Sequence, residues 1–378
     1  MFCAGALSGL SALPWLEVSA FAVSWRRRHA LASEVPAGVA IRQRAMPARP
    51  LHAAWGRYSQ PPVEWFIGRH DVVHGSNFVV PPTRRAARVM TVHDLGVVLY
   101  PELCDPSTLV FPDLIRRAAG EGAWVHTPSR FVADQVVAEL GIDPERVRAV
   151  HHGIPAAPDD RADPDDAAPP GALSSKAPPL ELPDGCRRYI LAIGTIEPRK
   201  DYPLLVSAFS SVAAAHPDVA LVIVGRDGWG IERYRAAVEA SPFRSRIVRP
   251  GYLDDRSLAA VLQHAAALVY PSVYEGFGFP PLQAMAAGVP VVATAAGAVP
   301  EVVGDGAVLV APADRDGLAA QVMAVLDGGP EVDRLIERGR RRSQEFTWSA
   351  CAQGLARLYQ DAVRSEESQA RARPATAR

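Results

Sequence analysis

The chain has 378 residues, of which 48% are hydrophobic, and a formal net charge of −1 at pH 7. This length is typical of two domains, and the apolar content is sufficient for two cores. A net charge so close to zero argues against a nucleic-acid-binding protein, because such proteins carry an excess of basic groups.

The amino-terminal stretch is mostly apolar and is followed by an arginine run, residues 26–28. A signal peptide would place its basic residues first, and Pro14 and Glu17 interrupt any membrane span, so neither is predicted. The plainer interpretation is a helix over about residues 3–13, followed by a strand over residues 16–23.

The first domain shows four further strand patterns, over residues 71–75, 87–93, 124–128 and 147–152. Helical patterns separate them. Ser129 is typical of an N-cap for a helix over residues 130–140 that ends at Gly141. Strands that alternate with helices predict an α/β fold with a parallel sheet covered on both faces.

Charge is unevenly distributed along the chain. Residues 1–100 hold eleven arginines and no lysine, against five carboxylates. A basic first domain suits a phosphorylated lipid acceptor or an anionic membrane surface. The alternative is a solvated arginine-rich surface, and the sequence favours neither.

Residues 155–186 are rich in proline, alanine and aspartate with little apolar periodicity, which predicts a linker between two domains. They include Asp163-Pro164-Asp165, a spacing by which another transferase fold binds a divalent metal, but no strand precedes it. The cysteines are scattered without paired spacing, at Cys3, Cys104, Cys186 and Cys351. We therefore predict neither a metal site nor a disulfide framework, which fits a reducing cytoplasm.

The second domain opens with a buried strand that ends at Gly194. Arg199 and Lys200 stand side by side in the loop that follows. Because this loop lies at the carboxyl end of a parallel strand, the two cations are expected to face the ligand cleft. An arginine fork and a lysine point charge suit a diphosphate, and the alternative is a solvated basic pair.

The rest of this domain continues the alternation of strands and helices. Strands are expected over residues 189–194, 220–224, 246–251, 265–271 and 289–293. Gly225 ends the second of these strands, and Tyr252 follows the third. The whole chain divides into a first domain over residues 1–154, a linker over 155–186, a second domain over 187–347 and a carboxyl-terminal helix over 348–365.

The stretch from Val273 to Glu301 carries the strongest chemical signal. A glycine loop, Glu275-Gly276-Phe277-Gly278, separates a buried strand from a helix whose first turn holds Pro280 and Pro281. A helix N-terminus at the carboxyl end of a parallel strand favours an anion such as phosphate. Glu275 stands at the mouth of this loop, and its own segment contains no cation with which it could pair.

This stretch resembles the donor-sugar motif of the retaining GT-B glycosyltransferases, which have two Rossmann-like domains, and in particular their large fourth family. The resemblance covers residues 4–363 and is strongest over 189–310. It implies that Glu275 and the amides of the loop after it contact the transferred sugar, with Gly276, Phe277 and Gly278 in that loop. It also implies that Arg199 and Lys200 neutralise the leaving diphosphate.

The resemblance further implies that Gly194, Gly225 and Tyr252 lie along the donor-binding loops. The family pattern is Glu, seven residues, Glu, and its second position usually holds the nucleotide ribose. Here that position is Gln283, which can exchange hydrogen bonds but lacks charge-assisted strength. We expect weaker donor binding or an altered nucleotide preference. The family often has an arginine directly after the glycine, where this chain has Thr195.

His93 ends a first-domain strand and is similar to the family's acceptor-side histidine, which implies that it positions the donor sugar or the acceptor hydroxyl. We do not assign it as a general base. In the family a first strand and a Gly-Gly loop precede the first helix. Neither occurs before the helix over residues 3–13, so the first domain is expected to begin one strand–helix step late. The last helix is expected to cross back to the first domain.

The expected activity is a retaining hexosyltransferase that needs no metal or other cofactor. Its donor is a nucleoside diphosphate sugar, with GDP-mannose favoured because residues 194–200 look most like mannosyltransferases. Its acceptor is a glycan or a lipid-linked glycan of cell-envelope polysaccharide, at a cytoplasmic location that includes the inner face of the membrane. Two alternatives stay open: a nucleotide-sugar epimerase of the same fold, and a non-catalytic partner subunit.

Overall fold

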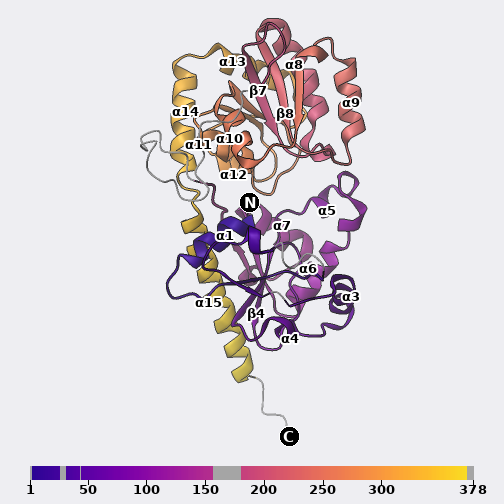
Figure 1. Ribbon diagram of the computed structural model, residues 1–378, viewed down its shortest axis with the longest axis vertical. Helices are drawn as coiled ribbons and strands as arrows, with labels where there is room; N and C mark the ends of the chain where they lie inside the picture. The colour runs from indigo at the N-terminus through magenta and orange to yellow at the C-terminus, as the bar shows by residue number, and fades with distance from the viewer. Residues whose placement is uncertain (1, 26–30, 43, 156–179, 373–378) are drawn as a thin grey trace. The chain divides into compact units, whose positions relative to one another are not determined.

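The computed structural model describes residues 2–25, 31–42, 44–155 and 180–372 (Figure 1). The chain forms two compact units, which are described separately. Unit 1 comprises Met1–Gly153 and Phe346–Arg378, and unit 2 comprises Ile154–Glu345. The arginine run at 26–28 and Asp163-Pro164-Asp165 lie outside the described residues.

Unit 2 is built on a six-stranded parallel sheet with the order β12-β11-β10-β7-β8-β9. Its strands are β7 (Arg188–Ile193), β8 (Val219–Val224), β9 (Ile247–Gly251), β10 (Ala267–Tyr270), β11 (Val291–Thr294) and β12 (Val308–Val310). The chain starts at β7, moves outward to β9, and returns on the other side of β7 with β10. The strand order therefore reverses between β7 and β10, where doubly wound sheets bind their ligands.

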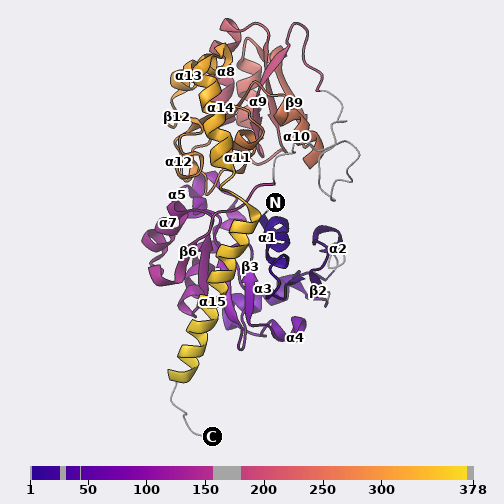
Figure 2. The same cartoon turned by 90° about the vertical axis from the view of Figure 1, so that its left-hand side faces the viewer.

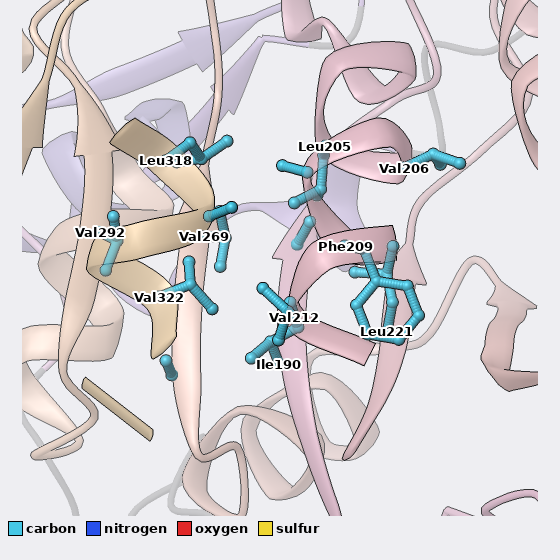
Figure 3. Close-up of a cluster of buried hydrophobic side chains, with 14 of the residues drawn as sticks. Ile190, Leu205, Val206, Phe209, Val212, Leu221, Val269, Val292, Leu318 and Val322 are labelled. Carbon is cyan, nitrogen blue, oxygen red and sulfur yellow. The ribbon is translucent and has the colours of Figure 1, made fainter. Parts of the chain in front are cut away.

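Helices cover both faces of this sheet, which confirms the predicted doubly wound α/β architecture. They are α8 (Tyr202–Ala215), α9 (Ile231–Ala240), α10 (Asp255–Gln263), α11 (Phe279–Ala286), α12 (Val299–Val303), α13 (Arg315–Asp327) and α14 (Pro330–Ser343). Figure 3 shows Phe209 of α8 and Leu318 of α13 packed with strand residues such as Val269. The strands read as continuous apolar runs because they are buried on both faces.

Unit 1 contains a four-stranded parallel sheet with the order β3-β4-β5-β6. Its strands are β3 (Val72–Gly75), β4 (Ala87–Thr91), β5 (Trp124–Thr127) and β6 (Val147–Ala149). The strand expected at residues 16–23 is shorter, β1 (Ser19–Phe21), because Leu16 closes a turn with Leu13. It pairs with β2 (Ala40–Arg42), which was not predicted, in a separate two-stranded sheet.

The helices of unit 1 are α1 (Phe2–Ser11), α2 (Leu31–Glu34), α3 (Ala48–Tyr58), α4 (Glu64–Ile67), α5 (Gly96–Leu99), α6 (Phe111–Gly120), α7 (Arg130–Leu140) and α15 (Trp348–Ala372). The predicted cap of α7 is observed. The Ser129 hydroxyl accepts from the Val132 amide at 3.2 Å, and Gly141 ends the helix with a φ of +66°.

The first and last helices of the described chain lie side by side (Figures 1 and 2). Two glycines of α1 make this possible. A Cβ added to Gly5 would lie 2.0 Å from the Trp348 ring, and one added to Gly9 would lie 2.5 Å from the Trp348 carbonyl oxygen. The helix expected at 348–365 is thus observed as α15, packed within unit 1. No helix among the described residues combines the length and apolarity needed to cross a bilayer.

Candidate active site

Two predicted glycines hold the loops after β7 and β8 against each other. A Cβ added to Gly225 would lie 1.9 Å from the carbonyl oxygen of Gly194, so no other residue fits there without movement of the backbone. Gly194 itself has a φ of +150°, which side-chain-bearing residues rarely adopt. These glycines thus set the shape of the loop that carries the two cations.

Arg199 and Lys200 lie in a single 3₁₀ turn, Pro198–Lys200, and both reach Glu275. The Lys200 Nζ lies 2.6 Å from Glu275 Oε1, and the Arg199 Nη1 lies 2.8 Å from Glu275 Oε2. Each carboxylate oxygen therefore takes one cation. The sequence placed Glu275 in a segment without cations, and its partners come instead from the loop after β7.

Residues that the sequence did not assign complete this cluster. Glu197 Oε1 accepts from Arg199 Nη2 at 2.6 Å, and the Tyr270 hydroxyl oxygen accepts from Lys200 Nζ at 2.8 Å. Two features of the sequence could have indicated them. Glu197 stands two residues before Arg199, and Tyr270 is the last residue of a buried strand. With two cations and two carboxylates, the cluster carries no net charge.

Burial alone would raise the pKa of the Glu275 carboxyl. The cations of Lys200 and Arg199 outweigh burial and lower this pKa to about 2. Burial also lowers the pKa of Lys200 from its ordinary value, and Glu275 opposes this effect. Glu275 is therefore a carboxylate at neutral pH, which is the form that pairs with both cations.

The backbone of Glu275 is fixed by the loop after β11. The Ala298 amide donates to the Glu275 carbonyl oxygen at 2.8 Å. A Cβ added to Gly297 would lie 2.2 Å from that same oxygen. On the other side, Gly278 has a φ of +117° and begins α11, which carries a proline in its first turn as predicted.

The remaining predicted donor residues also belong to unit 2. Gly276 and Phe277 are buried, and the Phe277 ring contacts Phe279 edge-on at 5.1 Å between centroids. Gln283 lies on α11 and is half-buried. Tyr252 follows β9 and is 60% exposed.

Arg226, which the sequence did not assign, lies with its guanidinium carbon 4.3 Å from the centre of the Tyr252 ring. Arg226 follows β8, and Tyr252 follows β9. The two side chains therefore make a cation–π contact at the carboxyl ends of two neighbouring strands.

His93 belongs to unit 1, where its Nε2 lies 2.9 Å from the Ser76 carbonyl oxygen. Since a carbonyl only accepts, this nitrogen carries the hydrogen and Nδ1 is left as an acceptor in the neutral ring. Burial lowers the pKa of His93 below its ordinary value, although the bond to Ser76 opposes this. The Phe2 and His152 rings lie 5.3 and 5.5 Å from the His93 ring.

Beside His93 runs a chain of hydrogen bonds that the sequence did not reveal. It links Tyr359 to His74 Nδ1 (2.7 Å), His74 Nε2 to Thr91 (2.8 Å), Thr91 to His126 Nδ1 (2.9 Å), and His126 Nε2 to the Val150 carbonyl oxygen (3.0 Å). Because the last group only accepts, every donor in a neutral chain is determined. Tyr359 donates to His74, His74 to Thr91, Thr91 to His126, and His126 to Val150.

These imidazoles are kept uncharged by burial. Burial, followed by the neighbouring histidines, lowers the pKa of His74 to about 3. Burial likewise lowers the pKa of His126 to about 4 and that of His152 well below its ordinary value. Within the described residues, no three His, Cys, Asp or Glu side chains are grouped so that they could hold a metal ion.

Residues 179–342 match the family described as "Glycosyl transferases group 1", and residues 15–157 match "Glycosyltransferase Family 4". The O-antigen chain mannosyltransferase B of Escherichia coli is 26% identical over 290 residues, which are 76% of this chain and 74% of that protein. The MMP alpha-(1->4)-mannosyltransferase of Mycolicibacterium hassiacum is 48% identical over 115 residues, which are 29% of this chain and 28% of that protein.

Solved structures show the same fold. A glycosyltransferase from Rickettsia africae aligns with a TM-score of 0.66 at 16% identity, covering 95% of this chain and 94% of that one. Anabaena HepE in complex with UDP aligns with a TM-score of 0.64 at 17% identity, covering 95% of this chain and 96% of that one.

Proposed function

The chain is a GT-B glycosyltransferase with a group 1 transferase domain, and from this premise we propose that it transfers a hexose from a nucleoside diphosphate sugar with retention of configuration. The observation that carries the proposal is the cluster of Arg199, Lys200 and Glu275. Its two cations follow β7 and its carboxylate follows β10, and the strand order of unit 2 reverses between these strands.

In the proposed reaction the bond between the anomeric carbon and the diphosphate breaks as the acceptor oxygen attacks from the same face. The acceptor's proton passes to an oxygen of the departing diphosphate. Arg199 and Lys200 stabilise the charge that develops there, which is the largest contribution expected of such a site. Glu275 positions the sugar, and neither a metal nor another cofactor takes part in the proposal.

Further residues are proposed to hold the rest of the substrates. Gln283 bonds the ribose, the exposed ring of Tyr252 and the Arg226 beside it lie along the base, and the loop amides of Gly276, Phe277 and Gly278 contact the sugar. On the acceptor side, His93 positions a hydroxyl or the donor sugar. Its Nδ1 is an acceptor in the neutral ring, and a hydroxyl can donate to it.

Mannose is the proposed sugar and GDP-mannose the proposed donor. Relatives named as mannosyltransferases support this choice, including the O-antigen chain mannosyltransferase B of Escherichia coli. The same relative supports the proposal that the acceptor is a glycan or a lipid-linked glycan of a cell-envelope polysaccharide.

The test is to incubate the purified protein with a panel of GDP- and UDP-sugars and to follow donor consumption by mass spectrometry, with and without glycan acceptors. We expect GDP-mannose to be consumed, with an α-linked product by NMR. Interconversion of the sugar without an acceptor would favour the epimerase. If the protein binds no nucleoside diphosphate, the result would favour the remaining alternative, a non-catalytic partner subunit.

We propose that the protein acts in the cytoplasm and that unit 1 contacts an anionic membrane surface there. Unit 1 exposes large aromatic side chains, namely Trp15, Trp25, Tyr58 and Trp65. Such side chains are favoured at the membrane interface, and the arginine excess of residues 1–100 would add attraction to acidic lipids. Co-sedimentation with vesicles containing phosphatidylglycerol, but not with phosphatidylcholine alone, is the expected result.

A further inference from the structure

Glu275 binds the cation pair as an anionic ligand would. Its two oxygens lie 2.6 Å from Lys200 Nζ and 2.8 Å from Arg199 Nη1, which are the distances of charge-assisted hydrogen bonds. All three side chains are largely buried. A carboxylate that bridges two cations in this way offers the same oxygen contacts as one phosphate group.

The cluster has no net charge left to attract an anion. Glu275 and Glu197 balance the two cations, so an arriving diphosphate would meet cations that are already neutralised. A diphosphate beside an unmoved Glu275 would also place like charges together in a largely buried site, where repulsion is weakly screened. Strong diphosphate binding therefore requires that Glu275 give up at least one of its two contacts.

The Glu275 backbone and the two cations have contacts that do not depend on the Glu275 carboxylate. The Glu275 carbonyl oxygen is held by the Ala298 amide at 2.8 Å, and Gly297 packs against it. The cations are held independently of Glu275, since Lys200 also donates to Tyr270 and Arg199 also donates to the Tyr274 carbonyl oxygen at 2.9 Å. Rotation of the Glu275 side chain would thus free cations that remain in place.

We propose that Glu275 is an internal substitute for the diphosphate in the empty protein, and that the diphosphate of the donor displaces it from Arg199 and Lys200. This inference rests on the proposed function. It gives Glu275 a second role, because the carboxylate that the diphosphate displaces is the one proposed to position the sugar. Binding of the diphosphate and release of Glu275 toward the sugar are then one event.

The experiment measures the affinity of inorganic pyrophosphate and of GDP by calorimetry for the full chain and for Glu275→Gln. The variant removes the internal anion but keeps the size of the side chain, so we expect it to bind pyrophosphate at least tenfold more tightly. Glu197→Gln is the matched control. It removes one negative charge from the same cluster but leaves Glu275 on both cations, so we expect a gain in affinity of less than threefold.

Glu275→Gln leaves two buried cations against one carboxylate and could fail to fold. Glu275→Asp is therefore measured beside it, since its shorter side chain retains the charge but cannot reach both cations from the same backbone. We expect an intermediate gain in affinity and a larger rise in Tm with pyrophosphate than the parent protein shows. If the parent binds GDP and neither variant binds pyrophosphate more tightly, the inference is wrong and the proposed function stands. If no form binds any nucleoside diphosphate, the proposed function falls as well.

Discussion

Each unit buries a polar cluster near the carboxyl ends of its parallel strands, and the two clusters avoid the cost of burying charge in opposite ways. In unit 2, Glu275 stays ionised because Lys200 and Arg199 bind both of its oxygens. In unit 1, His74 and His126 are neutral because burial makes the charged ring unfavourable. Paired charges can be exchanged for those of an incoming anion, whereas neutral rings joined end to end offer no such exchange. This difference supports the proposal that unit 2 binds the anionic diphosphate and that unit 1 has a positioning role.

The largest effect is expected from Glu275→Ala, which breaks the charged cluster. Transfer activity should fall by roughly 100-fold or more, since this carboxylate is proposed to position the sugar. Removal of one partner from a buried ion pair also costs about 3–5 kcal/mol of folding free energy. Turnover assays and chemical unfolding measure the two effects, and binding of GDP should persist. Equal loss of transfer and of GDP binding would contradict the proposed role.

As the pH falls, the neutral histidine cluster of unit 1 should lose stability before the charged cluster of unit 2 does. In the unfolded chain a histidine has its ordinary pKa of 6.5, whereas in unit 1 the pKa values of His74 and His126 are about 3 and 4. The unfolded chain therefore binds more protons as the pH falls below 6.5, and the free energy of unfolding drops by about 1.4 kcal/mol per pH unit for each such histidine. The loss should continue to about pH 4 for His126 and to about pH 3 for His74.

The charged cluster responds in a lower window. The pKa of Glu275 is lowered from 4.5 to about 2, so its contribution to stability is present above pH 4.5 and is lost as the pH falls toward 2. Urea unfolding between pH 7 and pH 4 tests the difference. His74→Gln should flatten the pH dependence in this range, and Glu275→Gln should not. If His74→Gln leaves the slope of unfolding free energy against pH unchanged, then burial does not keep the His74 ring neutral.

Arg199→Ala and Lys200→Ala each remove one of the two cations that contact Glu275 in the charged cluster of unit 2. Each is expected to cost about 1.5–3 kcal/mol of transition-state stabilisation, the range of hydrogen bonds to charged groups. The loss should appear in donor turnover because the diphosphate gains charge as it leaves. Steady-state kinetics with a fixed acceptor measure it, and unchanged kcat/KM in both variants would reduce the pair to a structural role.

Tyr359→Phe tests the neutral cluster with a change of one atom. The Tyr359 hydroxyl donates to His74 Nδ1 at 2.7 Å, and its removal leaves a buried acceptor without that donor. We expect a loss of about 1–3 kcal/mol in the free energy of unfolding. GDP binding should be unaffected, since Tyr359 belongs to unit 1. A neutral effect on stability would mean that water replaces the hydroxyl.

Gln283→Glu is expected to give the smallest effect and the only gain in donor affinity among these five predictions. A carboxylate at this position would make a charge-assisted hydrogen bond to the ribose, about twice as strong as the bond made by an amide. Donor binding should tighten by several-fold in a fluorescence titration. A measured loss of affinity would show that Gln283 does not meet the ribose.

The sequence predicted unit 2 well, for identifiable reasons. Its strands are apolar on both faces, and glycine and proline mark their ends, so β7 was predicted to within one residue and α11 was predicted with Pro280 and Pro281 in its first turn. Two strands of three residues were missed, β12 in unit 2 and β2 in unit 1. A strand this short does not show enough of an alternating pattern to be recognised from the sequence.

The contacts of the two clusters were less predictable than the elements that carry them. Glu275 and Lys200 are 75 positions apart, and only the reversal of strand order between β7 and β10 brings them together. The histidine chain depends on register, since Thr91 and His126 are partners on neighbouring strands. Periodicity predicts a strand but not its register, and hence not which polar side chains meet across the sheet.

Because α1 packs against α15, unit 1 can complete its fold during synthesis only after unit 2 has been made. Gly5 and Gly9 need Trp348 as their partner, so unit 1 is built from both ends of the described chain. Unit 2 is continuous and can fold as soon as it leaves the ribosome. About 190 residues separate the two parts of unit 1, which is roughly 10–40 s of synthesis at about 5–20 residues per second. For that interval the apolar cluster that contains Val89 and Trp124 lacks its contacts with α15 and keeps only those with α1, which leaves the kind of exposed apolar surface that chaperones bind.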